Sequence, residues 1–138
     1  MYASKHQAHQ AYNQVNIASE LEHATPHRLI SMLFEGALKQ LAIAKGAISR
    51  NDVPAKGLAI GKAIAIVGEL QNSLADTDTN EVSQNLMSLY DYVLRQMLEA
   101  NILSSDEKIN NVALILGEIK QGWDAIPDDK RTAIKQGS

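Results

Sequence analysis

The sequence lacks several features on which common functional sites depend. Its 138 residues include no cysteine, which excludes disulfides, cysteine-ligated zinc, iron–sulfur clusters and thiol nucleophiles. The 16 acidic residues outnumber the 13 basic ones, so no summed positive charge is available to bind a nucleic-acid backbone. No apolar run approaches the roughly 18 to 20 residues of a membrane span, and the opening residues lack the apolar stretch of a secretory signal. We therefore expect a protein that binds no nucleic acid, does not insert into a membrane and works where it is made.

Motifs for phosphate, dinucleotide or serine-nucleophile chemistry are also missing. One Glu-x-x-His match, Glu20 to His23, lies before the first long helical pattern, whereas a di-iron bundle needs two copies within its helices. Two histidine pairs have helical spacing, His6 with His9 and His23 with His27, and we interpret them as solvent-facing side chains. The sequence therefore predicts no catalytic residue, no metal and no cofactor.

What the sequence does contain is apolar residues at spacings of three and four, the period of one helical face. Four such stripes run through Leu29–Ile48, Ile60–Leu74, Val82–Ile102 and Ile109–Trp123. Thr25 before Pro26, and Asp52 two residues before Pro54, are typical of helix starts, because an oxygen-bearing side chain caps a helix and proline fits its first turn.

These patterns predict an all-α fold, an antiparallel four-helix bundle over residues 19–126. We expect a mobile N-terminal segment over residues 1–18 and a flexible tail over residues 127–138, because both are polar with few residues to bury.

Glycines and tyrosines in the helical stretches carry two further expectations. Gly57, Gly61 and Gly68 lie inside the second helix, where each costs about 1 kcal/mol relative to alanine. We favour close approach of a neighbouring helix as the reason, with simple tolerance as the alternative. Tyr90 and Tyr92 point about 200° apart on a helix, so one of them must face outward. That tyrosine is either a partner contact or an ordinary surface residue.

The third and fourth helices are more apolar than a bundle requires, which is about three positions in seven. Leu94, Leu98 and Ile102 on one helix, with Leu114 and Ile115 on the other, predict a contiguous apolar strip of the kind that marks an interaction surface. The strip could be covered in three ways: by the protein's own N-terminal segment, by a second copy, or by an amphipathic helix of another chain.

Several motifs occur in an order and spacing that together are specific. They are Tyr12–Val15, Thr25–Ala37, Asn85–Tyr92, Ala100-Asn101 and Trp123. In these motifs, from about Tyr12 to Trp123, the chain resembles the flagellar export chaperones of the FliS type.

The resemblance implies a helical bundle without catalytic residues that works in the bacterial cytoplasm. Its implied partner is the disordered C-terminal region of flagellin, which it keeps from polymerising before export. The resemblance also implies that the segment around Tyr12 can cap the groove when the partner is absent.

From the apolar strip and the resemblance together, we expect eleven partner-binding residues: Tyr12, Val15, Ile17, Leu86, Tyr90, Leu94, Leu98, Asn101, Ile102, Leu114 and Ile115. Other flagellar export or regulatory proteins are further candidate partners. A self-associating helical adaptor, or a weak homodimer, is the alternative that the sequence leaves open.

Overall fold

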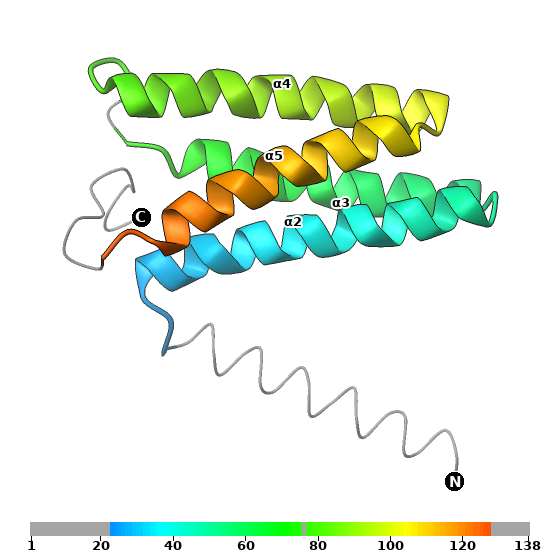
Figure 1. The fold of residues 1–138 in the computed structure, drawn as a ribbon, viewed down its shortest axis with the longest axis horizontal. Coiled ribbons are helices and arrows are strands. Elements are labelled where there is room, and N and C mark those ends of the chain that lie inside the picture. Colours follow the sequence, from blue (N-terminus) through cyan, green and yellow to red (C-terminus); the bar gives the residue numbers. More distant parts are fainter. Residues whose placement is uncertain (1–22, 76, 128–138) are drawn as a thin grey trace, which may run out of the picture.

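The computed structural model describes residues 23–75 and 77–127. Its helices are α2 (Pro26–Ser49), α3 (Val53–Asn72), α4 (Glu81–Leu103) and α5 (Asp106–Asp124). They run alternately in opposite directions and are joined by short connections (Figure 1). The expected all-α antiparallel four-helix bundle is confirmed. The N-terminal segment expected to be mobile, and all of the expected tail except Pro127, lie outside the described residues.

Each helix begins at a residue whose side chain caps its first turn. The caps are Thr25, Asp52, Asn80 and Ser105, and each accepts a hydrogen bond from the backbone N–H three residues further on. Such a cap stabilises a helix by about 1 kcal/mol, because it satisfies a donor that has no partner inside the helix. The two helix starts expected from the prolines are therefore confirmed.

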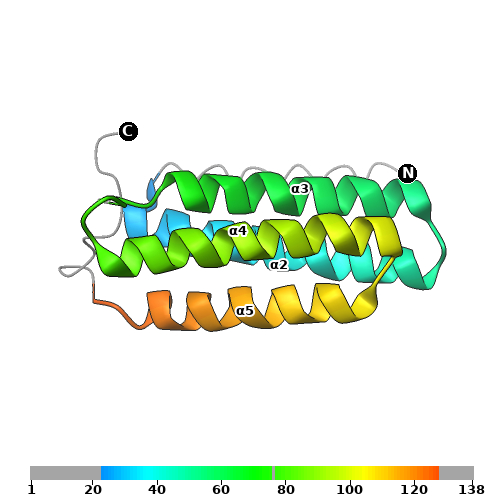
Figure 2. The same cartoon turned by 90° about the horizontal axis from the view of Figure 1, so that it is seen from above.

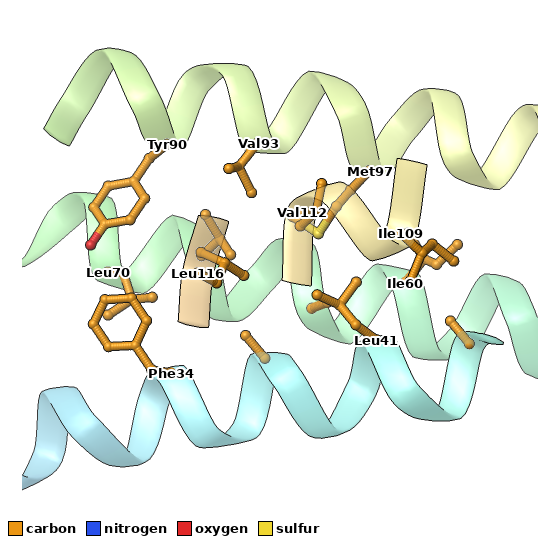
Figure 3. Packing of buried hydrophobic residues seen from close by; sticks show 14 of the residues in the cluster. Phe34, Leu41, Ile60, Leu70, Tyr90, Val93, Met97, Ile109, Val112 and Leu116 are labelled. Atoms are coloured by element: carbon orange, nitrogen blue, oxygen red, sulfur yellow. The ribbon is translucent and has the colours of Figure 1, made fainter. Parts of the chain in front are cut away.

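The helices are arranged as a square in which α2 packs against α3 and α5, and α4 packs against the same two helices (Figure 2). Apolar side chains spaced three and four apart point from each helix into the centre (Figure 3). The large, fully buried ones are Phe34, Leu41, Ile60, Val67, Leu70, Val93, Met97, Ile109, Val112 and Leu116. Burying one side chain of this size contributes about 1.5 to 3 kcal/mol, so this stripe pattern accounts for most of the driving force for folding.

The two ends of the bundle are built differently. At the closed end, tight turns join α2 to α3 and α4 to α5, and each turn contains a residue with positive φ, Asn51 (58°) and Ser104 (50°). The side chain of Lys56 is buried there, and its Nζ donates to the backbone oxygen of Asn101 (2.8 Å) and to Oγ of Ser104 (2.7 Å). Because a cation is favourable at a helix C-terminus, Lys56 ties the start of α3 to the end of α4.

At the open end, α2 and α4 begin while α3 and α5 end. The described chain enters and leaves the bundle here (Figure 1), and the longer connection between Asn72 and Glu81 also lies at this end. Fewer backbone turns close this end, and the next section shows what lies between its helices.

Candidate partner-binding surface

A hollow of about 100 Å³ lies between the helices at the open end. We call it the open-end pocket, and it is lined by Ile30, Phe34, Ser73, Leu74, Val82, Leu86, Tyr90, Ile119, Trp123 and Ile126. All four helices, or the residues directly after them, contribute to this lining. Since nearly all of these side chains are apolar or aromatic, the pocket suits an apolar group.

The Trp123 wall of the pocket is held by a reciprocal contact between α5 and α2. His27 Nε2 donates to the backbone oxygen of Trp123 (2.8 Å), while the indole Nε1 donates to the backbone oxygen of His27 (3.0 Å). The two rings stack with centroids 4.8 Å apart and planes 15° from parallel. These contacts fix the position of the indole ring beside the pocket.

A polar cluster one turn away reinforces the same helix pair. The carboxylate of Asp124 accepts hydrogen bonds from Lys120 on its own helix and from the hydroxyl of Ser31 on α2. These bonds, the one from Lys120 foremost, lower the pKa of Asp124 because they favour its charged form. The first turns of α2 and the last turn of α5 are thus joined by both ring and carboxylate contacts.

The tyrosines behave as expected from their spacing. Tyr92 faces outward with 41% of its surface exposed, whereas Tyr90 is 3% exposed and borders the open-end pocket. Burial raises the pKa of Tyr90, so its hydroxyl stays neutral and able to donate a hydrogen bond. The outward tyrosine is thus Tyr92, whereas Tyr90, which is among the eleven expected partner-binding residues, is buried beside the pocket.

A second apolar area lies on the outer face of α4. Leu98 and Ile102 are 54% and 80% exposed, while Leu94 packs partly against the core. Leu98 lies two helical turns after Asp91, which accepts a hydrogen bond from Gln71 of α3 (2.6 Å). The exposed leucine and isoleucine are therefore on the side of α4 that borders α3.

The α5 part of the expected strip lies elsewhere. Leu114 is 63% exposed and Ile115 is half-buried against the core. Lys108 bridges the seam between α5 and α4 by contacting Glu99 (2.8 Å), which raises the pKa of Lys108 and lowers that of Glu99. The expectation of one contiguous strip over the two helices is wrong, because residues four apart rotate by about 40° per step and carry Leu98 and Ile102 toward α3 instead.

The remaining predicted contacts divide into two groups. Leu86 is half-buried in the pocket wall, and Asn101 uses its backbone oxygen to hold Lys56. Tyr12, Val15 and Ile17 lie outside the described residues. The structure thus brings Leu86 and Tyr90 together at the pocket, and Leu98 and Ile102 together on the outer face.

Sequence reasoning missed the other pocket walls and the reason for the glycines. Phe34 and Trp123 read as ordinary core residues, and only their position near helix ends indicates that they meet at one end. A Cβ atom at Gly57, Gly61 or Gly68 would meet nothing within 4 Å among the described residues. The favoured explanation, close approach of a neighbouring helix, is therefore wrong for these glycines.

The described ranges contain no group of three or more histidine, cysteine, aspartate or glutamate residues that could hold a metal ion. Within the same ranges, no helix has both the length and the apolar character needed to cross a membrane. The expectation of a solvent-facing side chain is wrong for His27, which stacks on Trp123 and is partly buried, whereas His23 is exposed. Glu20, His6 and His9 lie outside the described part of the chain.

A helical bundle with an apolar pocket at one end and exposed aliphatic residues along one helix is typical of proteins that bind other chains. The family model described as "Flagellar protein FliS" matches residues 8–130. The chain therefore belongs to the FliS family, and the resemblance seen in its motifs is confirmed.

Curated relatives agree with this assignment. The chain is 42% identical over 126 residues to the flagellar secretion chaperone FliSB of Pseudomonas aeruginosa, covering 91% of this chain and 98% of that protein. It is 36% identical to the flagellar secretion chaperone FliS of Vibrio cholerae, covering 87% of this chain and 88% of that protein. It is 39% identical to FliS of Salmonella typhimurium, covering 84% and 87%. The family is thus one of flagellar secretion chaperones.

Proposed function

We propose that this protein is a cytosolic chaperone that binds the disordered C-terminal region of flagellin and prevents its polymerisation before export. The protein turns over no substrate. Its role is to cover apolar side chains of the segment that would otherwise pair with other flagellin subunits. Other flagellar export or regulatory proteins are candidate partners for the same surface.

The observation that carries the proposal is the apolar surface left uncovered on α4 in a chain of this family. Leu98 and Ile102 are more than half exposed, and burial of apolar area contributes about 25 cal/mol per Å². A segment that folds as it binds loses about 2 to 5 kcal/mol in becoming ordered, so it needs a long contact. The outer face of α4 and the open-end pocket together offer such a length.

The N-terminal segment belongs to the same proposal. Tyr12, Val15 and Ile17 are apolar residues in an otherwise polar stretch, and the segment joins α2 at the open end. We propose that they cover part of the surface when flagellin is absent. Asn101, Leu114 and Ile115 remain proposed contacts, with Leu114 the most accessible of the three.

Calorimetric titration with the C-terminal segment of flagellin tests the proposal. We expect a one-to-one complex and a gain of helix by far-UV circular dichroism when the two are mixed. A form lacking residues 1–18 should bind more tightly, because its surface is already uncovered. Absence of both heat and helix gain would contradict the chaperone function.

A matched pair of variants locates the surface. Leu98→Glu should weaken binding at least tenfold, because it places a charge on the proposed contact. Ile43→Glu, at a site 42% exposed on α2, should leave binding within about twofold of the wild type. Light scattering on the free protein addresses the alternative, since a self-associating adaptor would form a stable dimer and ignore flagellin.

A further inference from the structure

The open-end pocket contains one hydroxyl that makes no hydrogen bond. Its lining includes two hydroxyl groups, those of Ser73 and Tyr90. The Ser73 hydroxyl donates to the backbone oxygen of Leu70 (2.6 Å). The Tyr90 hydroxyl has no partner among the residues that the structure describes, although the side chain is 3% exposed.

The Tyr90 side chain points into the open end of the bundle. The side chain of Tyr90 reaches from α4 toward Phe34, which is itself a pocket residue (Figure 3). Among the described residues, the side-chain oxygen that is both fully buried and unpaired is that of Ser83, so the unpaired Tyr90 hydroxyl is open to the pocket. A bound segment can therefore replace water as its hydrogen-bond partner. Because burial raises the pKa of Tyr90, its hydroxyl stays neutral and can donate a hydrogen bond to an acceptor.

The pocket also continues into the proposed contact surface. Leu86, Tyr90, Leu94, Leu98 and Ile102 follow one another at steps of four residues along α4. Each step rotates by about 40°, so the line winds gradually from the pocket to the outer face. Exposure rises along it, from 3% at Tyr90 to 54% at Leu98 and 80% at Ile102. A bound segment that starts in the pocket can therefore run along α4 for about 24 Å.

We propose that the open-end pocket anchors one branched aliphatic side chain of the bound segment, and that the Tyr90 hydroxyl donates a hydrogen bond to a backbone carbonyl of the same segment. This inference rests on the proposed function and identifies the chemistry of one end of its site. The pocket of about 100 Å³ is smaller than the roughly 150 Å³ cavity that holds a benzene ring, which favours an aliphatic anchor over an aromatic one. Carbonyls inside a helix are already used, so the accepting residue lies at a helix end or in an extended stretch.

The chain carries its own reporter for this contact. Trp123 is its one tryptophan, and it lines the pocket. A flagellin C-terminal segment without tryptophan should therefore change the Trp123 fluorescence as it binds. Replacing the segment's large aliphatic residues by alanine one at a time should identify a single residue whose loss removes this change.

Tyr90→Phe tests the hydrogen bond without altering the shape of the side chain. We expect the Kd for the segment to rise about threefold to tenfold, the value of one ordinary hydrogen bond. The midpoint of thermal unfolding of the free variant should not fall, because the hydroxyl makes no hydrogen bond to the described residues of the free protein. Tyr92→Phe, on the outer face, should leave both quantities unchanged.

Each other outcome overturns a defined statement. If the segment binds the wild type but leaves Trp123 fluorescence unchanged, or binds Tyr90→Phe equally well, the pocket proposal is wrong and the chaperone proposal stands. If deletion of residues 1–18 itself shifts the fluorescence and the segment shifts it no further, the occupant is this chain's own segment and the proposal is overturned. If the segment does not bind the wild type at all, both proposals fall together.

Discussion

The closed and open ends of the bundle are made from side chains of different size. Near the closed end, Ala47 and Ala100 are fully buried, and a lysine completes the packing. Phe34, Tyr90 and Trp123 all lie at the open end, where a hollow remains between them. The closed end also has a hollow, of about 210 Å³, whose lining includes the polar side chains of Asn51, Lys56 and Ser104. The lining of the open-end pocket is instead nearly all apolar or aromatic. The two hollows therefore differ in chemistry, since the one at the closed end suits a polar group and the one at the open end suits an apolar group.

The largest expected effect tests whether the open end also supports the fold. Phe34→Ala should lower the free energy of unfolding by about 3 to 5 kcal/mol, measured by urea denaturation, because a fully buried ring is lost. Ile43→Ala on the same helix, at a half-exposed site, should cost less than about 1 kcal/mol. A small loss of stability in Phe34→Ala would mean that the open end adds little to the stability of the fold. The two ends of the bundle would then differ in stability as well as in lining.

The closed end depends on its buried lysine. Lys56→Met keeps the length of the side chain but removes the hydrogen bonds to Asn101 and Ser104, so unfolding should become easier by about 1.5 to 3 kcal/mol. Lys62→Met, at an exposed position of α3, is the control and should stay within about 0.5 kcal/mol of the wild type. Equal stability of the two variants would show that alanine packing alone closes this end.

The outer face of α3 offers an effect of opposite sign. Gly61→Ala should raise the free energy of unfolding by up to about 1 kcal/mol, because alanine favours the helix and its Cβ meets open space. Gly36→Ala should gain less, since its Cβ would lie 3.4 Å from Cδ1 of Ile66. A loss of stability at Gly61 would mean that this face is covered in solution.

The smallest expected effect is the pH dependence of the contact between α2 and α5. Hydrogen bonds from Lys120 and Ser31 lower the pKa of Asp124 in the folded state. Their contribution is therefore complete above the ordinary aspartate pKa of about 3.9, and it is lost as the pH falls through the lower folded value. Chemical denaturation between pH 7 and pH 3 should show a shallower acid loss for Asp124→Asn than for the wild type. Identical acid slopes would indicate that the stacked rings alone hold this corner.

Much of the fold was predictable because it depends on local signals. The stripe from Leu29 to Ile48, the cap at Thr25 and the polar break at Asn51 each act within a few residues, and each matches the structure. The outward tyrosine followed from helix geometry alone. Such features need no knowledge of which helices are neighbours.

The site was harder to predict because it depends on how the helices are rotated against one another. Leu98 and Leu114 both read as surplus apolar residues, and both are exposed, but the ion pair of Glu99 and Lys108 bridges the seam between their helices. The pocket requires side chains from every helix to meet at one end, which no local pattern encodes. The three glycines were misread for the same reason, since their neighbours are set by packing rather than by sequence.

The order of the helices has a consequence for how quickly this protein is ready to act. Three of its closely packed helix pairs are consecutive along the chain, and only α2 with α5 brings distant residues together. Bundles with such local contacts fold in microseconds to milliseconds. His27 and Trp123, which close the seam between α2 and α5, are 96 residues apart, so forming this seam carries the largest loop-closure cost. We therefore expect it to form last during folding and to open first. We expect a newly made molecule to mature well ahead of the far longer synthesis of a client chain.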